Sequence, residues 1–86
     1  MDATDIPTYR RAVRAHLAER PAIWQPAATL HRHLVREYGS TLGETEQACA
    51  VLVALGHLSI HHDALGGATR YYAATAAGIL AHERGE

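Results

Sequence analysis

Apolar residues recur along this chain with two spacings, one typical of helices and the other of strands. From residue 6 to about residue 20 the spacing is three or four, at Ile6, Tyr9, Val13 and Leu17. A helix turns by about 100° per residue, so this spacing places the four side chains on one side of a helix. Pro21 ends the helix, because the residue before a proline is driven away from helical backbone angles.

A second helix is predicted for residues 27–38. Its apolar side chains share one face, and Arg32 and Arg36 lie on the other face. Gly39 follows directly, and a glycine readily adopts the left-handed conformation in which many helices end. The connection to the next periodic stretch is therefore only a few residues long.

The third helix is predicted from residue 42 to about residue 55. Thr41 and Glu44 match the S/T-x-x-E capping box, in which each side chain satisfies a backbone N–H of the first helical turn. Gly56 is a natural left-handed stop. On a helical wheel the inner positions are Thr41, Thr45, Ala48, Leu52 and Leu55, with Cys49 and Val51 at the margins. The outer positions are Gly43, Glu46, Gln47, Ala50, Val53 and Ala54.

Two strand-like runs follow, joined by a Gly-Gly turn, and together they span residues 57–74. The first run, HLSIHHD, alternates with the two-residue period of a half-buried strand. The second, TRYYAA, is rich in residues that suit a pleated surface. A third, brief strand is predicted at residues 23–25, between two prolines. Thr75 is expected to cap a last helix over residues 76–84, with Ile79 and Leu80 facing inward.

This order of elements predicts an α+β fold of the winged helix-turn-helix type. It comprises a three-helix core, a two-stranded wing with a short third strand, and a short C-terminal helix. A chain of 86 residues forms one domain, here residues 1–86. Residues 1–5 are expected to be a tail in which Thr4 or Asp5 caps the first helix. The helix over residues 42–55 then occupies the position of a DNA-reading helix.

The stretch from Arg70 to Gly78, RYYAATAAG, carries a resemblance to a known family. It resembles the YY-x-L-T-x-x-G end of the wing in PadR-like and MarR-like transcriptional regulators. The preceding ALGHLSIHHDALGGATRYY is similar to their wing. The resemblance covers about residues 7–81 and implies a winged helix that binds DNA. Ala74 stands where the pattern usually has Leu, and the long C-terminal pairing helix of PadR-like proteins has no counterpart here.

Composition narrows the functional classes. The formal net charge is −1 with His neutral, and every fixed positive side chain is an Arg. A dedicated DNA-binding domain more often carries a clear basic excess, so affinity for DNA would require arginines gathered on one face. A single cysteine excludes an internal disulfide, and no apolar stretch reaches the ~18 residues of a membrane span. The sequence thus predicts a cytoplasmic protein, for which a small core makes a homodimer a reasonable expectation.

The leading hypothesis is sequence-specific binding of double-stranded DNA by a small dimeric transcriptional regulator. Arginine side chains suit phosphates and guanine, and glutamine suits adenine. Phosphate contacts are predicted for Arg32, Arg36 and Arg70. Residues expected to approach the major groove are Ser40, Thr41, Thr45 and Gln47. The predicted reading helix carries no cation, so the second helix and the wing would supply most of the affinity.

The alternative belongs to another class, a protein-interaction module or adaptor subunit with little DNA binding. The smooth outer face formed by Ala50, Val53 and Ala54 would then dock a protein partner, since contiguous exposed apolar surface commonly marks interfaces.

A third option is a metal-dependent regulator that uses the wing histidines. Their spacing matches no metal motif, so neither a metal nor another cofactor is predicted; His62 is instead expected to lie half-buried beside Tyr71 or Tyr72. No catalytic set emerges. Cys49 is predicted to be semi-buried in mid-helix, away from a dipole that would activate it. The sequence therefore predicts a protein that is not an enzyme.

Overall fold

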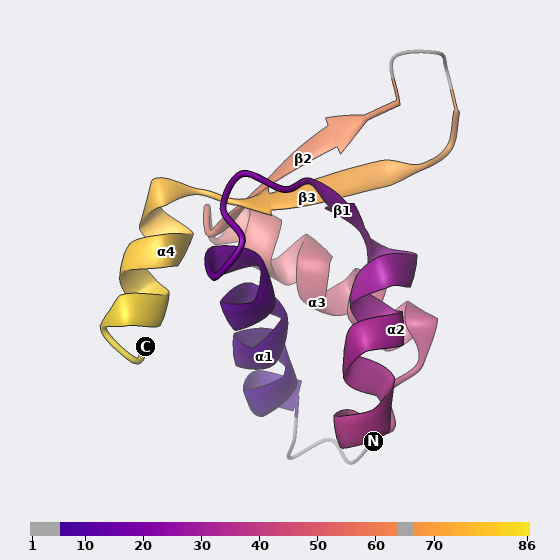
Figure 1. The fold of residues 1–86 in the computed structure, drawn as a ribbon, viewed down its shortest axis with the longest axis horizontal. Coiled ribbons are helices and arrows are strands. Elements are labelled where there is room, and N and C mark those ends of the chain that lie inside the picture. The colour runs from indigo at the N-terminus through magenta and orange to yellow at the C-terminus, as the bar shows by residue number, and fades with distance from the viewer. Residues whose placement is uncertain (1–5, 64–66) are drawn as a thin grey trace.

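The computed structural model describes residues 6–63 and 67–86. Within them the chain forms four helices and a three-stranded antiparallel sheet, a small α+β fold (Figure 1). The elements in order are α1 (Ile6–Ala18), β1 (Gln25–Pro26), α2 (Ala27–Tyr38), α3 (Leu42–Ala54), β2 (Leu58–His62), β3 (Arg70–Ala74) and α4 (Ala76–Glu83). The predicted tail at residues 1–5, with its cap at Thr4 or Asp5, and the wing-turn residues 64–66 lie outside the described residues.

The predicted elements are present, with shifts at some ends. α2 has the predicted bounds, α3 and α4 each end one residue early, and α1 ends at Ala18 instead of near residue 20. A hydrogen bond from the Arg20 backbone N–H to the Leu17 carbonyl, at 3.1 Å, tightens the chain into a turn before Pro21. The helix therefore ends before Pro21, as predicted, but it ends at Ala18, two residues earlier than expected.

The sheet places β3 in the middle, in the order β1-β3-β2. β2 and β3 pair along their full length, from Leu58 opposite Ala74 to His62 opposite Arg70. The short strand predicted at residues 23–25 is real but lies at Gln25–Pro26, where it pairs with Tyr72 and Tyr71. A proline is tolerated there because β1 is an edge strand. In Figure 1 the β2–β3 hairpin extends beyond the helices that pack under it.

The core lies where α1, α2 and α3 meet beneath β3. Its most deeply buried apolar residues are Tyr9, Val13, Leu17, Leu30, Cys49, Leu52 and Leu58. Periodicity identified six of these seven as inward-facing, because each lies on the apolar face of an amphipathic helix or strand. The exception is Cys49, which was placed at the margin of that face and is fully buried rather than semi-buried.

Several helix ends have the predicted chemistry. Gly39 and Gly56 adopt positive φ, at 61° and 79°. The Thr75 hydroxyl accepts a hydrogen bond from the Gly78 backbone N–H, at 3.1 Å, and so caps α4. Gly78 also allows α4 to lie directly on the chain after α3, because a Cβ at this position would stand 2.1 Å from the His57 carbonyl oxygen. This close approach explains why a glycine ends the Thr75–Gly78 pattern.

Several residues face differently from the prediction. Thr41 and Leu55 were placed on the inner side of the third helix, but they flank α3 and both are exposed, Leu55 by 61%. Leu80 was expected to face inward from α4 but is 43% exposed. Ala18, which is not one of the four apolar positions that the spacing identified on the first helix, is also buried. Val53 was assigned to the outer side of α3, but it is only partly exposed and packs against the core. A helical wheel gives the directions of the side chains relative to one another. It does not show how far the neighbouring helices and strands extend, and so which of those side chains they cover.

Candidate nucleic-acid interface

The capping box predicted at the start of α3 is present. The Thr41 backbone N–H donates to the Glu44 carboxylate at 2.8 Å, and the Glu44 N–H donates to the Thr41 hydroxyl at 3.1 Å. The first of these bonds lowers the pKa of Glu44, so its carboxylate stays ionised at neutral pH. These two residues fix the angle at which α3 leaves the turn, and so the direction in which its exposed side chains point.

A groove lies between the start of α3, β3 and the start of α2. Its walls are formed by Pro26 and Ala27, by Leu42 and Glu46, and by Ala68, Thr69, Arg70 and Tyr72, and its volume is about 380 Å³. Arg70 and Glu46 place opposite charges on this groove. Burial raises the pKa of the Tyr72 hydroxyl, while the nearby Arg70 acts in the opposite direction, so the phenol remains a neutral hydrogen-bonding group.

Five of the seven residues predicted to contact DNA are exposed: Arg32, Arg36, Thr41, Gln47 and Arg70. Of these, the groove includes Arg70. Gln47 lies one position beyond Glu46 on α3, and Arg32 and Arg36 lie on the exposed side of α2. The sequence singled out these residues by their chemistry, and their exposure leaves them available for contacts; helical phase had placed Thr41 on the inner side.

Thr45 cannot meet DNA, contrary to the prediction, because it is fully buried. Its hydroxyl donates to the Thr41 carbonyl oxygen at 3.1 Å. Since that bond uses its only proton, the Thr45 oxygen accepts from the Tyr9 hydroxyl, at 2.6 Å. The same side chain had been placed on the inner side of the helix, and that placement is the correct one.

Ser40 was also predicted to approach the major groove, and it too is buried, with 3% of its surface exposed. Its hydroxyl has no hydrogen-bond partner among the described residues. Its carbonyl oxygen lies 2.9 Å from His31 Nε2, and because a carbonyl can only accept, this ring nitrogen carries the proton. The hydrogen bond from His31 thus fixes the turn between α2 and α3 to α2.

The outer face of α3 changes character along its length. Its first half presents Leu42, Glu46 and Gln47, and its second half presents Ala50 and Ala54, all exposed. No cation lies on α3, as the sequence shows. The first half therefore offers hydrogen-bonding groups, whereas the second half offers apolar surface.

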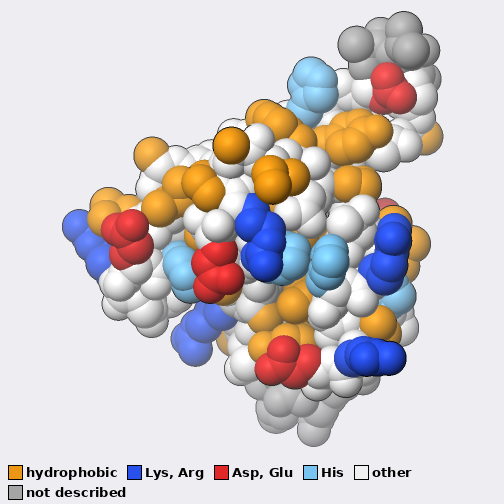
Figure 2. Space-filling view, in the orientation of Figure 1, with side chains coloured by type: hydrophobic (Ala, Val, Ile, Leu, Met, Phe, Trp, Pro, Cys, Tyr) orange, Lys and Arg blue, Asp and Glu red, His pale blue; other side chains and the backbone are white. Residues whose placement is uncertain are grey.

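On the face of the molecule shown in Figure 2, basic and acidic side chains are interspersed and form no continuous basic stripe. Arg14 on α1 is buried, with 6% of its surface exposed. Its guanidinium donates to His57 Nδ1, at 3.2 Å, and to the backbone carbonyl of Glu86. Helix α1 therefore offers fewer exposed charges than the sequence suggests.

The histidines are dispersed over separate contacts. His16 stacks near His33, with ring centroids 4.9 Å apart, and the His61 ring lies 5.6 Å from that of Trp24. His62 was expected to be half-buried beside a tyrosine, but it is exposed and lies opposite Arg70, since β2 extends past the core at that point. Across residues 6–63 and 67–86, no three His, Cys, Asp or Glu side chains are placed to hold a metal ion together.

Cys49 is the one thiol of the chain, and its environment makes it inert. Burial raises the pKa of this thiol to about 12, so it remains protonated at neutral pH. A protonated buried thiol is a poor nucleophile and a poor metal ligand.

Comparison with known proteins finds no matching protein-family model and no similar curated protein. Within the described part of the chain, none of the helices has both the length and the apolar content needed to cross a membrane.

Proposed function

We propose that this chain is a winged helix-turn-helix domain that binds double-stranded DNA, as a dimeric cytoplasmic regulator of transcription. The element order supports the fold: two helices joined by the turn Gly39–Thr41, then a β-hairpin and a closing helix. The resemblance of RYYAATAAG to the wing end of PadR-like and MarR-like regulators points the same way.

The groove beside Arg70 is the observation that carries the proposal. A reading helix acts through the exposed side chains of its first turns, and here those turns share one groove with a wing arginine. Arg70 would bind a backbone phosphate while Gln47 approaches base edges from α3. Glutamine can make two hydrogen bonds to adenine, and Glu46 can accept one from the amino group of cytosine.

The affinity of this surface is expected to be modest and strongly dependent on salt. Three exposed arginines, Arg32, Arg36 and Arg70, are available for phosphates, and each phosphate neutralised contributes a slope of about −0.9 in log K against log salt. Glu44 and Glu46 lower the potential near the start of α3. Most of the electrostatic attraction therefore comes from α2 and β3 rather than from α3.

Binding of a fluorescent duplex pool, followed by anisotropy at several salt concentrations, tests this proposal. Replacing Arg36 and Arg70 together by Gln should weaken binding and lower the salt slope by about 2 per protomer. Arg84→Gln is the matched control, because Arg84 is an equally charged, exposed arginine at the end of α4. Absence of duplex binding by the intact protein at low salt would refute the proposal.

A second candidate function rests on the other half of α3. Ala50 and Ala54 are exposed there, and Leu55 directly after the helix is 61% exposed. Such a patch suits a protein partner better than it suits DNA. This alternative predicts that Ala50→Arg disrupts a complex with another protein while the fold remains intact. It also predicts that the intact protein fails to bind the duplex pool.

The homodimer has a candidate route in the free edge of β2. In the described residues β2 pairs with β3 on one side and leaves its other edge open, and Ile60 on it is 37% exposed. Open edges pair readily with another strand unless a proline, a lysine or a bulge protects them, and residues 58–62 contain neither of those residue types. Sedimentation of the intact protein and of Ile60→Pro tests this route, because the backbone groups of Ile60 point to the open edge while those of Ser59 and His61 face β3. A dimer that becomes a monomer in Ile60→Pro is the expected result.

A further inference from the structure

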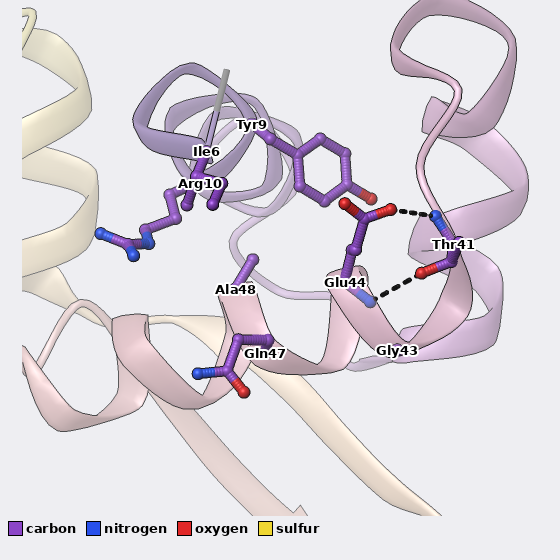
Figure 3. A pocket seen from close by; sticks show the side chains of 8 residues that line it. All are labelled: Ile6, Tyr9, Arg10, Thr41, Gly43, Glu44, Gln47 and Ala48. Atoms are coloured by element: carbon purple, nitrogen blue, oxygen red, sulfur yellow. Dashed lines mark hydrogen bonds between the residues drawn. The ribbon is translucent and has the colours of Figure 1, made fainter. Parts of the chain in front are cut away.

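A second hollow lies between α1 and the first turns of α3. Ile6 and Tyr9 of α1 face Gly43 and Ala48 of α3 across it, and its volume is about 300 Å³ (Figure 3). This volume is at the lower end of the range for small-molecule sites, and mostly apolar walls with a few polar groups are typical of such sites. The pocket therefore has room for one ring or a short carbon chain.

The polar groups of the pocket are unevenly placed. Figure 3 shows the Arg10 guanidinium and the Gln47 amide on one side of Ala48, and the Tyr9 ring with the Glu44 carboxylate on the other side. Arg10 forms no hydrogen bond or ion pair with any described residue, and its Nε is buried without a partner. With respect to the described residues, Arg10 is thus a charged donor, partly removed from water, whose hydrogen-bonding capacity is unused.

The carboxylate and the phenol that line the pocket already have hydrogen-bond partners. The Glu44 carboxylate accepts from the Thr41 backbone N–H at 2.8 Å and lies at the positive end of α3, whose partial charge it offsets. The Tyr9 hydroxyl is bonded to Thr45 at 2.6 Å. Among the described residues that line the pocket, the donors of Arg10 and Gln47 therefore bond to no other side chain or backbone group.

We propose that this pocket binds a small amphipathic acid. The apolar body of the ligand fills the space between Ile6, Tyr9 and Ala48, and its carboxylate accepts hydrogen bonds from the Arg10 guanidinium and the Gln47 amide. Charge complementarity selects the acid over a neutral analogue, because a bond between two charged groups is markedly stronger than one between neutral groups. The proposal does not depend on DNA binding, and its test involves no DNA.

Hexanoate and its neutral analogue hexanamide are the probes, and backbone amide shifts in NMR spectra of the full chain are the readout. Millimolar hexanoate is expected to shift the amides of Arg10, Gly43, Gln47 and Ala48. Arg10→Gln should weaken hexanoate about tenfold and change hexanamide by less than about twofold, because only the acid loses a charged bond. Arg11→Gln is the matched control, since it removes the same charge from the exposed residue next along α1.

A second variant fills the pocket without removing charge. A Cβ at Gly43 would meet only the Thr41 hydroxyl, at 3.8 Å, so Gly43→Leu can place its side chain in the hollow without a backbone clash. This variant should keep the dispersed spectrum of a folded chain and should bind neither probe. Hexanoate shifts that are absent at millimolar concentration, that fall elsewhere on the protein, or that survive both Arg10→Gln and Gly43→Leu would overturn the proposal.

Discussion

The two sides of α3 differ in how closely the rest of the protein constrains them. On the inner side Thr45 and Cys49 are fully buried, and Thr45 is hydrogen-bonded to both α1 and the turn before α3. On the outer side Gln47 and Ala50 are exposed. Stability should therefore respond to changes on the inner side, and binding to changes on the outer side, so that each side can be altered with little effect on the other property.

The largest contrast is expected between two leucines three positions apart. Leu52 is 2% exposed, and Leu52→Ala should cost about 2–5 kcal/mol of unfolding free energy, since it leaves a cavity in the core. Leu55 is 61% exposed, and Leu55→Ala should change the free energy by less than about 0.5 kcal/mol. Denaturant unfolding measures both. Similar losses in the two variants would contradict the placement of the core.

The next effect concerns the buried hydroxyl of Thr45. Thr45→Val keeps the shape but leaves the Tyr9 hydroxyl without its partner, which should cost about 1–3 kcal/mol. The double variant with Tyr9→Phe should lose less than the sum of the two single losses, because both remove the same bond. If Thr45→Val instead weakened duplex binding at unchanged stability, Thr45 would not be buried. The sequence-based prediction that Thr45 approaches the major groove would then be correct.

A smaller effect is expected from the cap of α3 as the pH falls. The pKa of Glu44 is lower in the folded protein than in the unfolded chain, because it accepts a hydrogen bond from the Thr41 N–H. Its stabilising contribution is therefore complete above the unfolded pKa and is lost as the pH falls through the folded pKa. Urea unfolding across the acid range should show this loss in the intact protein and not in Glu44→Gln. Parallel pH profiles for the two proteins would contradict it.

The smallest effect on stability belongs to the outer side. Ala50→Arg adds a long charged side chain at an exposed helical position, so the unfolding free energy should change by less than about 0.5 kcal/mol. If the second half of α3 lies near DNA, the added cation should strengthen duplex binding; if that half docks a protein, the same change should disrupt the complex. A large loss of stability would show that Ala50 is packed rather than free.

Local signals predicted the elements of this fold well. The capping box at Thr41, the left-handed Gly39 and Gly56, and the cap at Thr75 each depend on residues close in sequence, and all are present. The sides of α1, α2 and α3 that face the core also followed largely from periodicity, whereas in α4 Leu80 was expected to face inward and is exposed. The exposure of Leu55 did not follow from periodicity, because it depends on where neighbouring elements end.

The candidate site was predicted less completely, because the burial of its residues depends on contacts between distant parts of the chain. Ser40 was assigned by its position in the turn, but its burial depends on how that turn packs in the folded chain. Arg14 is buried in contact with His57 and Glu86, 43 and 72 positions away along the chain. No local pattern reports such contacts. The pocket beside Arg10 was missed for the same reason, since it exists only where α1 and α3 meet.

The most direct test of the central proposal is an NMR map of the protein titrated with duplex DNA at low salt. The proposed DNA-binding surface, formed by the groove at Arg70 and the exposed side chains at the start of α3, predicts the largest amide shifts at Thr41, Gln47 and Arg70. Smaller shifts are expected along the exposed side of α2, and none at the buried Thr45 beyond those of its neighbours. Shifts confined to Ala50–Leu55, or a spectrum unchanged by DNA, would contradict the account and leave the protein-interaction function as the better description.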